Sequence, residues 1–376
     1  MVGYAHGEQS GGGTGALHLS CGKWRKRAHR EVRGDTMIRR VMITGMLVFG
    51  LAFGQYRDIP EVVTKVATSA ANWLKLETSA RAIGMGGSHV ASGRGVAGIP
   101  YNPASVAFVE KSEAYFSMVN YLAGIQHGVF SYARKMGPSD YVGFHLFYLD
   151  SGPMSVTNEY YPDGTGEDFR VMSTSFRGTY ARRLTDRLKV GGSLNYIRDI
   201  IYEAGMQTVA FDIGSNFDTG IYGVVLGMSI TNFGPEVQYN GESLHIAVPD
   251  TIDVDERVSK ITTTFPLPLV FRLGFENELV GPNSVFVKNP VHSFKVSLDG
   301  IKPNDYTVYG AMGFEYSWQN MAFARTGMHL GHDTAGMSAG AGVRLRLGKM
   351  MAVVDYAFVD YDILRMTHQV ALGIEF

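Results

Sequence analysis

The chain has 376 residues, with 34 basic and 35 acidic side chains, so its formal net charge is −1. Charged residues make up only 18% of it, whereas it contains 46 glycines, 12% aromatic residues and a single cysteine. Low charge with abundant glycine argues against a helical bundle, and one cysteine excludes a disulfide framework. A large antiparallel sheet with one apolar and one polar face fits best.

The first 54 residues are predicted to lie outside the mature fold. Residues 1–36 are polar and basic, and we expect a non-native or disordered lead-in. Residues 37–54 begin with two arginines, continue as an apolar run and end in small residues, which is typical of a secretory signal peptide cleaved after Gly54. The alternative, a single anchoring helix, is disfavoured because the apolar run is short. Cleavage would also remove Cys21, so the mature chain needs another source of stability, such as a closed sheet.

Residues 55–111 show neither a helical period nor strand alternation. Gly84, Gly86 and Gly87 permit positive φ angles and close approach of the backbone. The dipeptide Asn102-Pro103 predicts an extended-to-turn geometry just before the regular structure begins. Two interpretations are open, an internal plug or a flexible tail, and the choice depends on whether the rest of the chain encloses a lumen.

From residue 112 onward the chain divides into segments with period-2 alternation, separated by turn signals. In residues 336–347 the aliphatic side chains share one face, while two arginines and three glycines share the other. A water-filled lumen suits the polar face and lipid suits the aliphatic one. We therefore predict an all-β fold, a transmembrane antiparallel β-barrel of about 14 strands over residues 112–376. A soluble β-sandwich or propeller is the alternative. The fourteen predicted strands are residues 112–121, 127–136, 141–149, 168–183, 187–201, 205–217, 221–231, 267–278, 291–300, 306–316, 320–330, 336–347, 350–358 and 367–376.

The predicted connections alternate in length, as they do in outer-membrane barrels. Short turns fall at one end, and the two longest connections, 150–167 and 232–266, fall at the other. Residues 279–290 are long but fall at the short-turn end, which indicates either a large turn or an error in the strand count. Phe376 ends an amphipathic strand, and we interpret it as the signal that the bacterial barrel assembly machinery reads.

A barrel of this size encloses a lumen that something must fill or gate. The segment 55–111 precedes the first strand and has room to fold inward. We therefore predict that it plugs the lumen, with Arg81 available to pair with carboxylates of the wall.

Four stretches resemble the PorV/PorQ family, which is itself similar to the FadL-type outer-membrane transporters. They are LKLETSARAIGMGGSHVAS with the following YNPASVA, ITNFGPEVQYNGESL, KPNDYTVYGAMGFEYSWQNMAFARTGMHLG and VDYAFVDYDILRMTHQVALGIEF. The resemblance implies a fourteen-stranded FadL-like barrel whose amino-terminal segment sits in the lumen. It marks a plug motif, Arg81, Gly84, Met85, Gly86, Gly87, Asn102, Pro103 and Ala104, and loop motifs with Asn232, Gly234, Pro235, Asn304 and Asp305. After the double glycine, SGRGVAG lacks the acidic residues usual in the family, which leaves a family-type plug ion pair open.

No catalytic group, cofactor or metal site is predicted. His329 and His332 stand three residues apart at a strand end and are expected to point to opposite faces. The acidic loop 158–168 lacks the ligand spacing of a recognised calcium loop. We therefore expect a protein that is not an enzyme.

Two functions remain open. The resemblance implies a PorV-like role in type IX-like protein secretion, in which long outer loops bind exported cargo proteins and other secretion components take part. The alternative is a FadL-like channel that takes up hydrophobic small molecules. Both place the chain in the outer membrane of a Gram-negative bacterium, in contact with lipid and the barrel assembly machinery, and neither involves nucleic acid.

Overall fold

The structure is a computed structural model, and it describes residues 65–247, 257–259, 262–332, 336–361 and 366–376. The predicted lead-in (1–36), the predicted signal peptide (37–54) and the first residues of the predicted plug lie outside the described residues.

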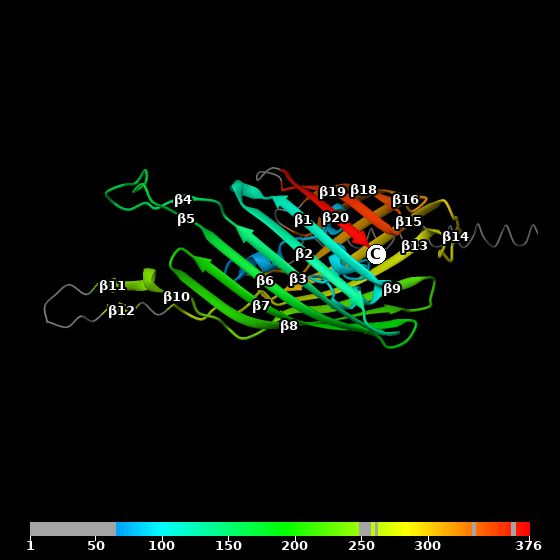
Figure 1. Cartoon of the computed structure of the whole chain (residues 1–376), viewed down its shortest axis with the longest axis horizontal. Helices are drawn as coiled ribbons and strands as arrows, with labels where there is room; N and C mark the ends of the chain where they lie inside the picture. Colours follow the sequence, from blue (N-terminus) through cyan, green and yellow to red (C-terminus); the bar gives the residue numbers. More distant parts are fainter. Residues whose placement is uncertain (1–64, 248–256, 260–261, 333–335, 362–365) are drawn as a thin grey trace, which may run out of the picture. The chain divides into compact units, whose positions relative to one another are not determined.

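Within this described part, fourteen long antiparallel strands form the wall of the molecule (Figure 1). Each predicted segment corresponds to one of them, with boundaries within three residues of those expected. The strands are β1 (Ser112–Asn120), β2 (Gln126–Lys135), β3 (Asp140–Asp150), β6 (Val171–Arg183), β7 (Leu188–Ile201), β8 (Ala204–Asp218), β9 (Val224–Phe233), β13 (Val270–Gly281), β15 (His292–Pro303), β16 (Tyr309–Trp318), β17 (Ala322–Leu330), β18 (Met337–Leu347), β19 (Met350–Asp360) and β20 (Met366–Glu375).

The sheet closes on itself. The first and last strands, β1 and β20, pair antiparallel from Glu113 opposite Glu375 to Asn120 opposite His368. Strand β9 pairs with both β8 and β13, which completes the ring. Closure removes the free sheet edges, so no row of backbone hydrogen-bonding groups is left unpaired within a bilayer. The predicted fourteen-stranded barrel is confirmed.

The two faces of each strand have opposite chemistry, as β6 illustrates. Its outward side chains include Met172, Phe176 and Tyr180, each about half exposed. Its inward side chains include Ser173 and Arg177, which are buried. An apolar exterior around a polar interior is the reverse of a water-soluble barrel and is the arrangement that lipid requires.

The connections distinguish the two ends of the barrel. We call the end with the connections 151–170 and 234–269 the loop end, and the end with the turns 136–139, 184–187 and 348–349 the turn end. Short strands occupy the long connections at the loop end (Figure 1): β4 (Met154–Ser155), β5 (Asp168–Phe169), β10 (Asn240–Gly241), β11 (His245–Ala247) and β12 (Arg257–Ser259).

One turn-end connection is long, as the sequence indicates. Residues 282–291 contain β14 (Val287–Lys288), which pairs parallel with the end of β13. The strand count is therefore correct, and this connection is a large folded turn.

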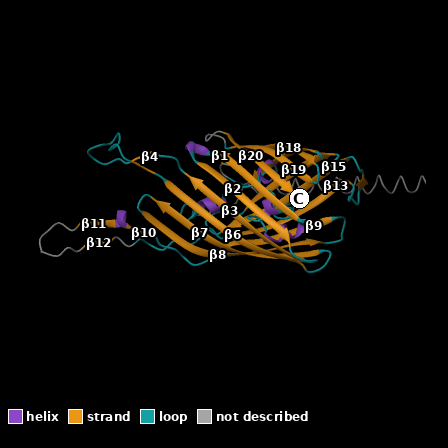
Figure 2. Cartoon of the chain, viewed as in Figure 1, coloured by secondary structure: helices purple, strands orange, loops and turns teal. Residues whose placement is uncertain are grey.

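Helical turns are short in this structure (Figure 2). They are η1 (Asn72–Lys75), α2 (Ala80–Gly84), η2 (Val96–Gly98), η3 (Pro103–Phe108), η4 (Leu122–Gly124) and η5 (Glu242–Leu244). In the residues described, none is long and apolar enough to cross a membrane.

The apolar side chains on the outer face of the barrel predict how a charged substitution affects stability. Phe176 lies near the middle of β6, is 48% exposed and stacks on Phe144 at 6.1 Å between ring centroids. We expect Phe176→Arg to destabilise the barrel in lipid vesicles by about 2–4 kcal/mol, because a cation at the bilayer midplane loses its hydration. Urea unfolding in vesicles, followed by heat-modifiable gel migration, measures this. Tyr160→Arg, in the connection 151–170 and 86% exposed, is the control and should leave the midpoint unchanged; equal midpoints for the two variants would contradict a lipid-facing position.

Candidate functional site: the plugged lumen

The segment before β1, which we call the plug (residues 69–111), runs through the barrel from one end to the other. At the loop end, the Ala70 amide donates to the Pro266 carbonyl at 3.0 Å, and Lys75 pairs with buried Asp305 at 2.7 Å. At the turn end, the Lys111 carbonyl accepts from the Lys135 amide at 2.8 Å. Between these points, side chains on the inward face of the wall hold the plug.

Helix α2 carries the central ion pair between plug and wall. The Ser79 hydroxyl caps the helix by accepting from the Ala82 amide. One turn of helix then places Arg81 against Glu315 of β16, with Nε–Oε2 and Nη2–Oε1 distances of 2.7 and 3.0 Å. This two-pronged geometry is the strong form of an arginine–carboxylate contact, and it provides the wall carboxylate expected for Arg81.

The same carboxylate continues into the wall. Arg325 of β17 donates from Nε to Glu315 at 2.8 Å and from Nη1 to Asp355 of β19 at 2.5 Å. Glu315 and Arg325 are almost fully buried. Two arginines and two carboxylates therefore alternate from plug to wall, so that each buried charge has an opposite neighbour.

Inward-facing glycines let the plug backbone lie directly on the strands. A Cβ at Gly327 of β17 would overlap the Gly86 nitrogen, and one at Gly313 of β16 would lie 2.6 Å from the Met85 carbonyl oxygen. The glycines whose Cβ would meet the plug backbone are Gly191, Gly227, Gly313, Gly327 and Gly340, whereas a Cβ at Gly214 would meet the side chains of Asn102 and Pro103. Only glycine permits this approach. The sequence pattern did not identify these wall residues.

The glycine pair of the plug motif has the geometry that its sequence predicts. Gly86 and Gly87 adopt positive φ angles of 64° and 79°. Gly84 has an ordinary helical conformation, and a Cβ there would lie 3.2 Å from Gly340 Cα. Gly84 is thus needed for space and Gly87 for conformation, while Gly86 is needed for both, because a Cβ there would lie 2.4 Å from the Met328 nitrogen.

Asn102 holds three backbone groups together. Its Oδ1 accepts from the Ala104 amide at 3.0 Å, which caps η3 with Pro103 in the first helical position. Its Nδ2 donates to the carbonyls of Val90 and Ser215 at 2.9 Å each. The Asn-Pro-Ala triplet therefore joins two parts of the plug to β8.

A second wall carboxylate binds the plug through its backbone. Asp299 of β15 accepts from the amides of His89 and Val90 at 2.7 and 2.8 Å. Sequence reasoning did not single out Asp299. Its position on the inward face of a strand is the same as that of many residues without a contact to the plug.

Arg94 supplies an ion pair in the segment SGRGVAG. The segment lacks acidic residues, but Arg94 itself pairs with Glu276 of β13 at 2.5 Å and lies over the Phe108 ring at 4.1 Å. A plug ion pair therefore forms in this segment, with the carboxylate supplied by the wall.

Of the loop motifs, Asn232 belongs to the wall and not to a connection. It ends the inward face of β9 at a positive φ of 62°. Its amide donates to Asp212 at 2.6 Å and its Oδ1 accepts from Arg177 at 3.1 Å, beside the Arg177–Asp212 ion pair. A Cβ at Gly234 would lie 2.8 Å from Leu267, and Pro235 is exposed.

The second loop motif ties the loop end together. Asn304 donates from its amide to Leu269 and from Nδ2 to Leu267, both at 2.9 Å. Asp305 is the partner of Lys75. This turn therefore contacts both the long connection 234–269 and the start of the plug.

Phe376 lies at the turn end next to β1. Its backbone exchanges two hydrogen bonds with Ser112, and its ring stacks on Tyr132 at 6.3 Å between centroids. Its reading by the assembly machinery stays a prediction.

Aromatic side chains gather at the loop end of the lumen. Trp73 of η1 stacks on Phe147 of β3 at 5.2 Å, and His127 stacks on the same ring at 5.4 Å. Tyr121 lies edge-on to both His127 and Tyr361. Trp73 Nε1 and His127 Nδ1 are buried without a hydrogen-bond partner among the described residues, so this region has unused donors and acceptors.

The expectation that His329 and His332 diverge is wrong. Their ring centroids lie 5.6 Å apart, because Gly331 (φ 78°) turns the chain at the strand end. Tyr306 and Tyr309 contact His332 at 5.3 and 5.0 Å, so the histidines belong to an aromatic group.

The turn end of the lumen is charged instead. A cavity of about 690 Å³ lies between plug and wall, and both contribute ionic side chains to it, including Arg81, Arg94, Glu315, Arg325, Arg344 and Asp355. The lumen is therefore aromatic towards the loops and ionic towards the turns.

Glu77 is an unusual acid between these regions. One of its oxygens, Oε2, is buried and has no hydrogen-bond partner among the described residues. Burial raises the pKa of the Glu77 carboxyl, while a hydrogen bond with Tyr101 and the charge of Arg272 oppose the shift. Glu77 Oε1 and His329 Nε2 both lie next to Gly87, since a Cβ there would be 3.1 Å and 3.0 Å from them.

No protein-family model matches the chain, and no curated protein matches it in sequence. Solved structures are similar. The toluene transporter TodX of Pseudomonas putida is 13% identical with a TM-score of 0.50, over 80% of this chain and 97% of its own. The CymD monoaromatic hydrocarbon channel is 12% identical with a TM-score of 0.50, over 79% and 96%. A FadL homologue of Pseudomonas aeruginosa is 13% identical with a TM-score of 0.48, over 79% and 97%.

At this level of identity the similarity shows the fold alone. The barrel fold that the sequence resemblance implies is supported by the similarity to TodX and CymD, and membership of the PorV/PorQ family is not supported.

The glycine contacts predict how to loosen the plug. In Gly327→Ala the new methyl group meets backbone atoms of Met85 and Gly86, so the plug must shift, at an overpacking cost of about 1–3 kcal/mol. We expect higher conductance in planar bilayers and faster proteolysis of the plug. The matched control is Gly178→Ala, since a Cβ at Gly178 of β6 meets nothing within 4 Å. Identical conductance of the two variants would refute the direct plug–wall contact.

The raised pKa of Glu77 predicts that the stability of the plug depends on pH. A raised carboxyl pKa means that the folded plug prefers the protonated acid, so stability is greatest at acid pH and decreases as pH rises through the raised pKa. Glu77→Gln removes the ionisation and should flatten the dependence of plug stability on pH, as limited proteolysis of the plug from acid to neutral pH would reveal. Glu159→Gln, at an exposed position of connection 151–170, serves as control. A Gln variant that retains the wild-type profile would exclude Glu77 as its source.

Proposed function

We propose that the protein is an outer-membrane channel that takes up small, predominantly hydrophobic molecules and keeps its lumen closed with the plug when no solute is present. The observation that carries this proposal is the fold. The barrel of fourteen strands in the described residues is similar in fold to TodX and CymD, a toluene transporter and a monoaromatic hydrocarbon channel.

The polarity of the lumen supports uptake that begins at the loop end. Trp73, Phe147 and Tyr121 belong to an aromatic cluster at the loop end in which Phe147 is buried, and an aromatic lining of this kind suits planar apolar solutes. The cavity between plug and wall around Arg81 and Glu315 is ionic and would solvate such a molecule poorly. A solute accepted at the loop end therefore needs a movement of the plug before it can leave.

That movement would break specific contacts. The plug is attached by Lys75–Asp305 near the loops and by Arg81–Glu315 and Arg94–Glu276 further in. The outermost pair joins a partly exposed lysine through a single contact, whereas Arg81 makes a two-pronged one. Opening from the loop end inward is the order that costs least.

A second candidate is the secretion role. It rests on the sequence resemblance and on the long connections 151–170 and 234–269, which would be the surface for exported cargo. Purification from the native membrane in mild detergent separates the two roles. Copurified secreted proteins with a shared carboxy-terminal β-domain favour secretion, and copurified apolar molecules without a protein partner favour uptake.

Tryptophan fluorescence tests the uptake proposal directly. With Trp24 and Trp318 replaced by phenylalanine, Trp73 is the only tryptophan left of the three in the chain. We expect toluene to change Trp73 emission saturably and to enter proteoliposomes faster than protein-free vesicles. Phe147→Ala should weaken toluene binding by about 0.5–1.5 kcal/mol, because the ring that stacks on Trp73 is lost. Phe271→Ala, on the outer face, should leave toluene binding unchanged. A linear, non-saturating response would count against a site at the loop end.

A further inference from the structure

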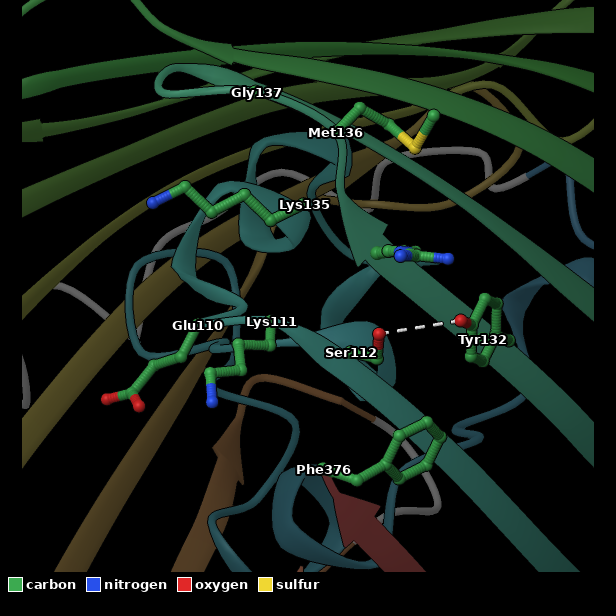
Figure 3. A pocket seen from close by; sticks show the side chains of 9 residues that line it. Glu110, Lys111, Ser112, Tyr132, Lys135, Met136, Gly137 and Phe376 are labelled. Carbon is green, nitrogen blue, oxygen red and sulfur yellow. Dashed lines mark hydrogen bonds between the residues drawn. The ribbon is translucent and has the colours of Figure 1, made fainter.

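A groove opens on the rim of the turn end, outside the lumen (Figure 3). Its volume is about 610 Å³, and it lies where β1, β2 and the end of β20 meet. Tyr132 and Phe376 form one side of it, and Lys111 lies across Ser112 on the other (Figure 3). Arg134 and Lys135 complete its basic lining.

The groove continues the lipid-facing band of the barrel. Phe116 and Phe130 are opposite each other on the outward face of β1 and β2, and each is about half exposed. Two residues further towards the turn end on that face stands Tyr132, and two further again stands Arg134. The sequence of apolar, aromatic and then cationic side chains is the one found where hydrocarbon gives way to headgroups.

The cations of the groove have no carboxylate partner among the described residues, although Lys135 lies over the Tyr141 ring at 5.8 Å. Among the described residues, no carboxylate lies within 4.0 Å of Lys111, Arg134 or Lys135, and the lining holds one acidic side chain, Glu110. A nearby rim arginine differs in this respect, since Arg182 lies 3.6 Å from Asp140. The groove thus presents an excess of positive charge beside an aromatic wall.

We infer that this groove binds the phosphate of an anionic phospholipid in the leaflet at the turn end. The acyl chains would lie along Phe116 and Phe130, the glycerol region against Tyr132 and Phe376, and the phosphate between Arg134 and Lys111. Arginine suits this position because its guanidinium donates to two phosphate oxygens at once. The ring of Tyr132 is held by stacking on Phe376 and by its hydroxyl, which donates to Ser112 at 3.5 Å.

The site requires only that the barrel spans a bilayer, and it does not depend on what passes through the lumen. A lipid held at this place would bridge the seam between the first and last strands, β1 and β20, on the outer surface. If the phospholipid site proved absent, the uptake proposal would therefore remain intact.

Native mass spectrometry of the whole protein in mild detergent tests the inference. Phosphatidylglycerol is the probe and phosphatidylcholine the reference lipid. We expect preferential retention of phosphatidylglycerol, and an affinity lowered about tenfold or more in Lys111→Gln/Arg134→Gln, because charge-assisted hydrogen bonds are lost. The matched control is Arg187→Gln/Lys288→Gln, which removes the same charge from the same end outside the groove.

Two further measurements keep the outcomes distinct. Arg134→Lys retains the charge but not the two-pronged donor, and should give an intermediate affinity. Heat-modifiable migration verifies that every variant is folded. Equal retention of the two lipids, an equal loss in the control variant, or displacement by millimolar inorganic phosphate would each overturn a site built for a phospholipid.

Discussion

The plug backbone lies in direct contact with the strand backbone at inward-facing glycines, and the other plug–wall interactions depend on that approach. At Gly313 and Gly327 there is no room for even a methyl group between the two. At this separation, short wall side chains reach the main chain of the plug, and Asp299 accepts from two consecutive amides. An irregular segment leaves many backbone groups unpaired, so a polar wall at contact distance is what makes it stable inside a barrel.

Ion pairs then fix which part of the plug meets which strand. The chain of charges from Arg81 through Glu315 and Arg325 to Asp355 is largely buried. Such a chain adds little net stability compared with apolar packing, but removal of Glu315 would leave Arg81 without its carboxylate partner, at a cost of about 3–5 kcal/mol. The pairs therefore favour one register of the plug over its neighbours. To keep the lumen closed, the plug needs a single register more than it needs a large binding energy.

The barrel was predictable from the sequence, and most of the plug contacts were not. Each strand is recognisable locally, because lipid outside and water inside impose a period of two on every segment, as in residues 336–347. Gly86 and Asn102 were also visible, since glycine pairs and Asn-Pro have local conformational meaning. The partners were hidden: Arg81 and Glu315 are 234 residues apart, and only the closed register brings them together. Gly327 and Asp299 look like ordinary inward residues for the same reason.

The two faces of the wall change character together along the barrel axis. Inside, aromatic rings such as Trp73 and Phe147 lie towards the loops, and the ionic cavity around Glu315 lies towards the turns. Outside at the turn end, the apolar band gives way to Tyr132 and then to Arg134. Cationic side chains at that end line the groove on the outside, as Arg134 does, and pair with carboxylates on the inside, as Arg325 does with Glu315. In the uptake that we propose, an apolar solute would therefore meet aromatic side chains near the loops first, and the ionic cavity only after the plug has moved.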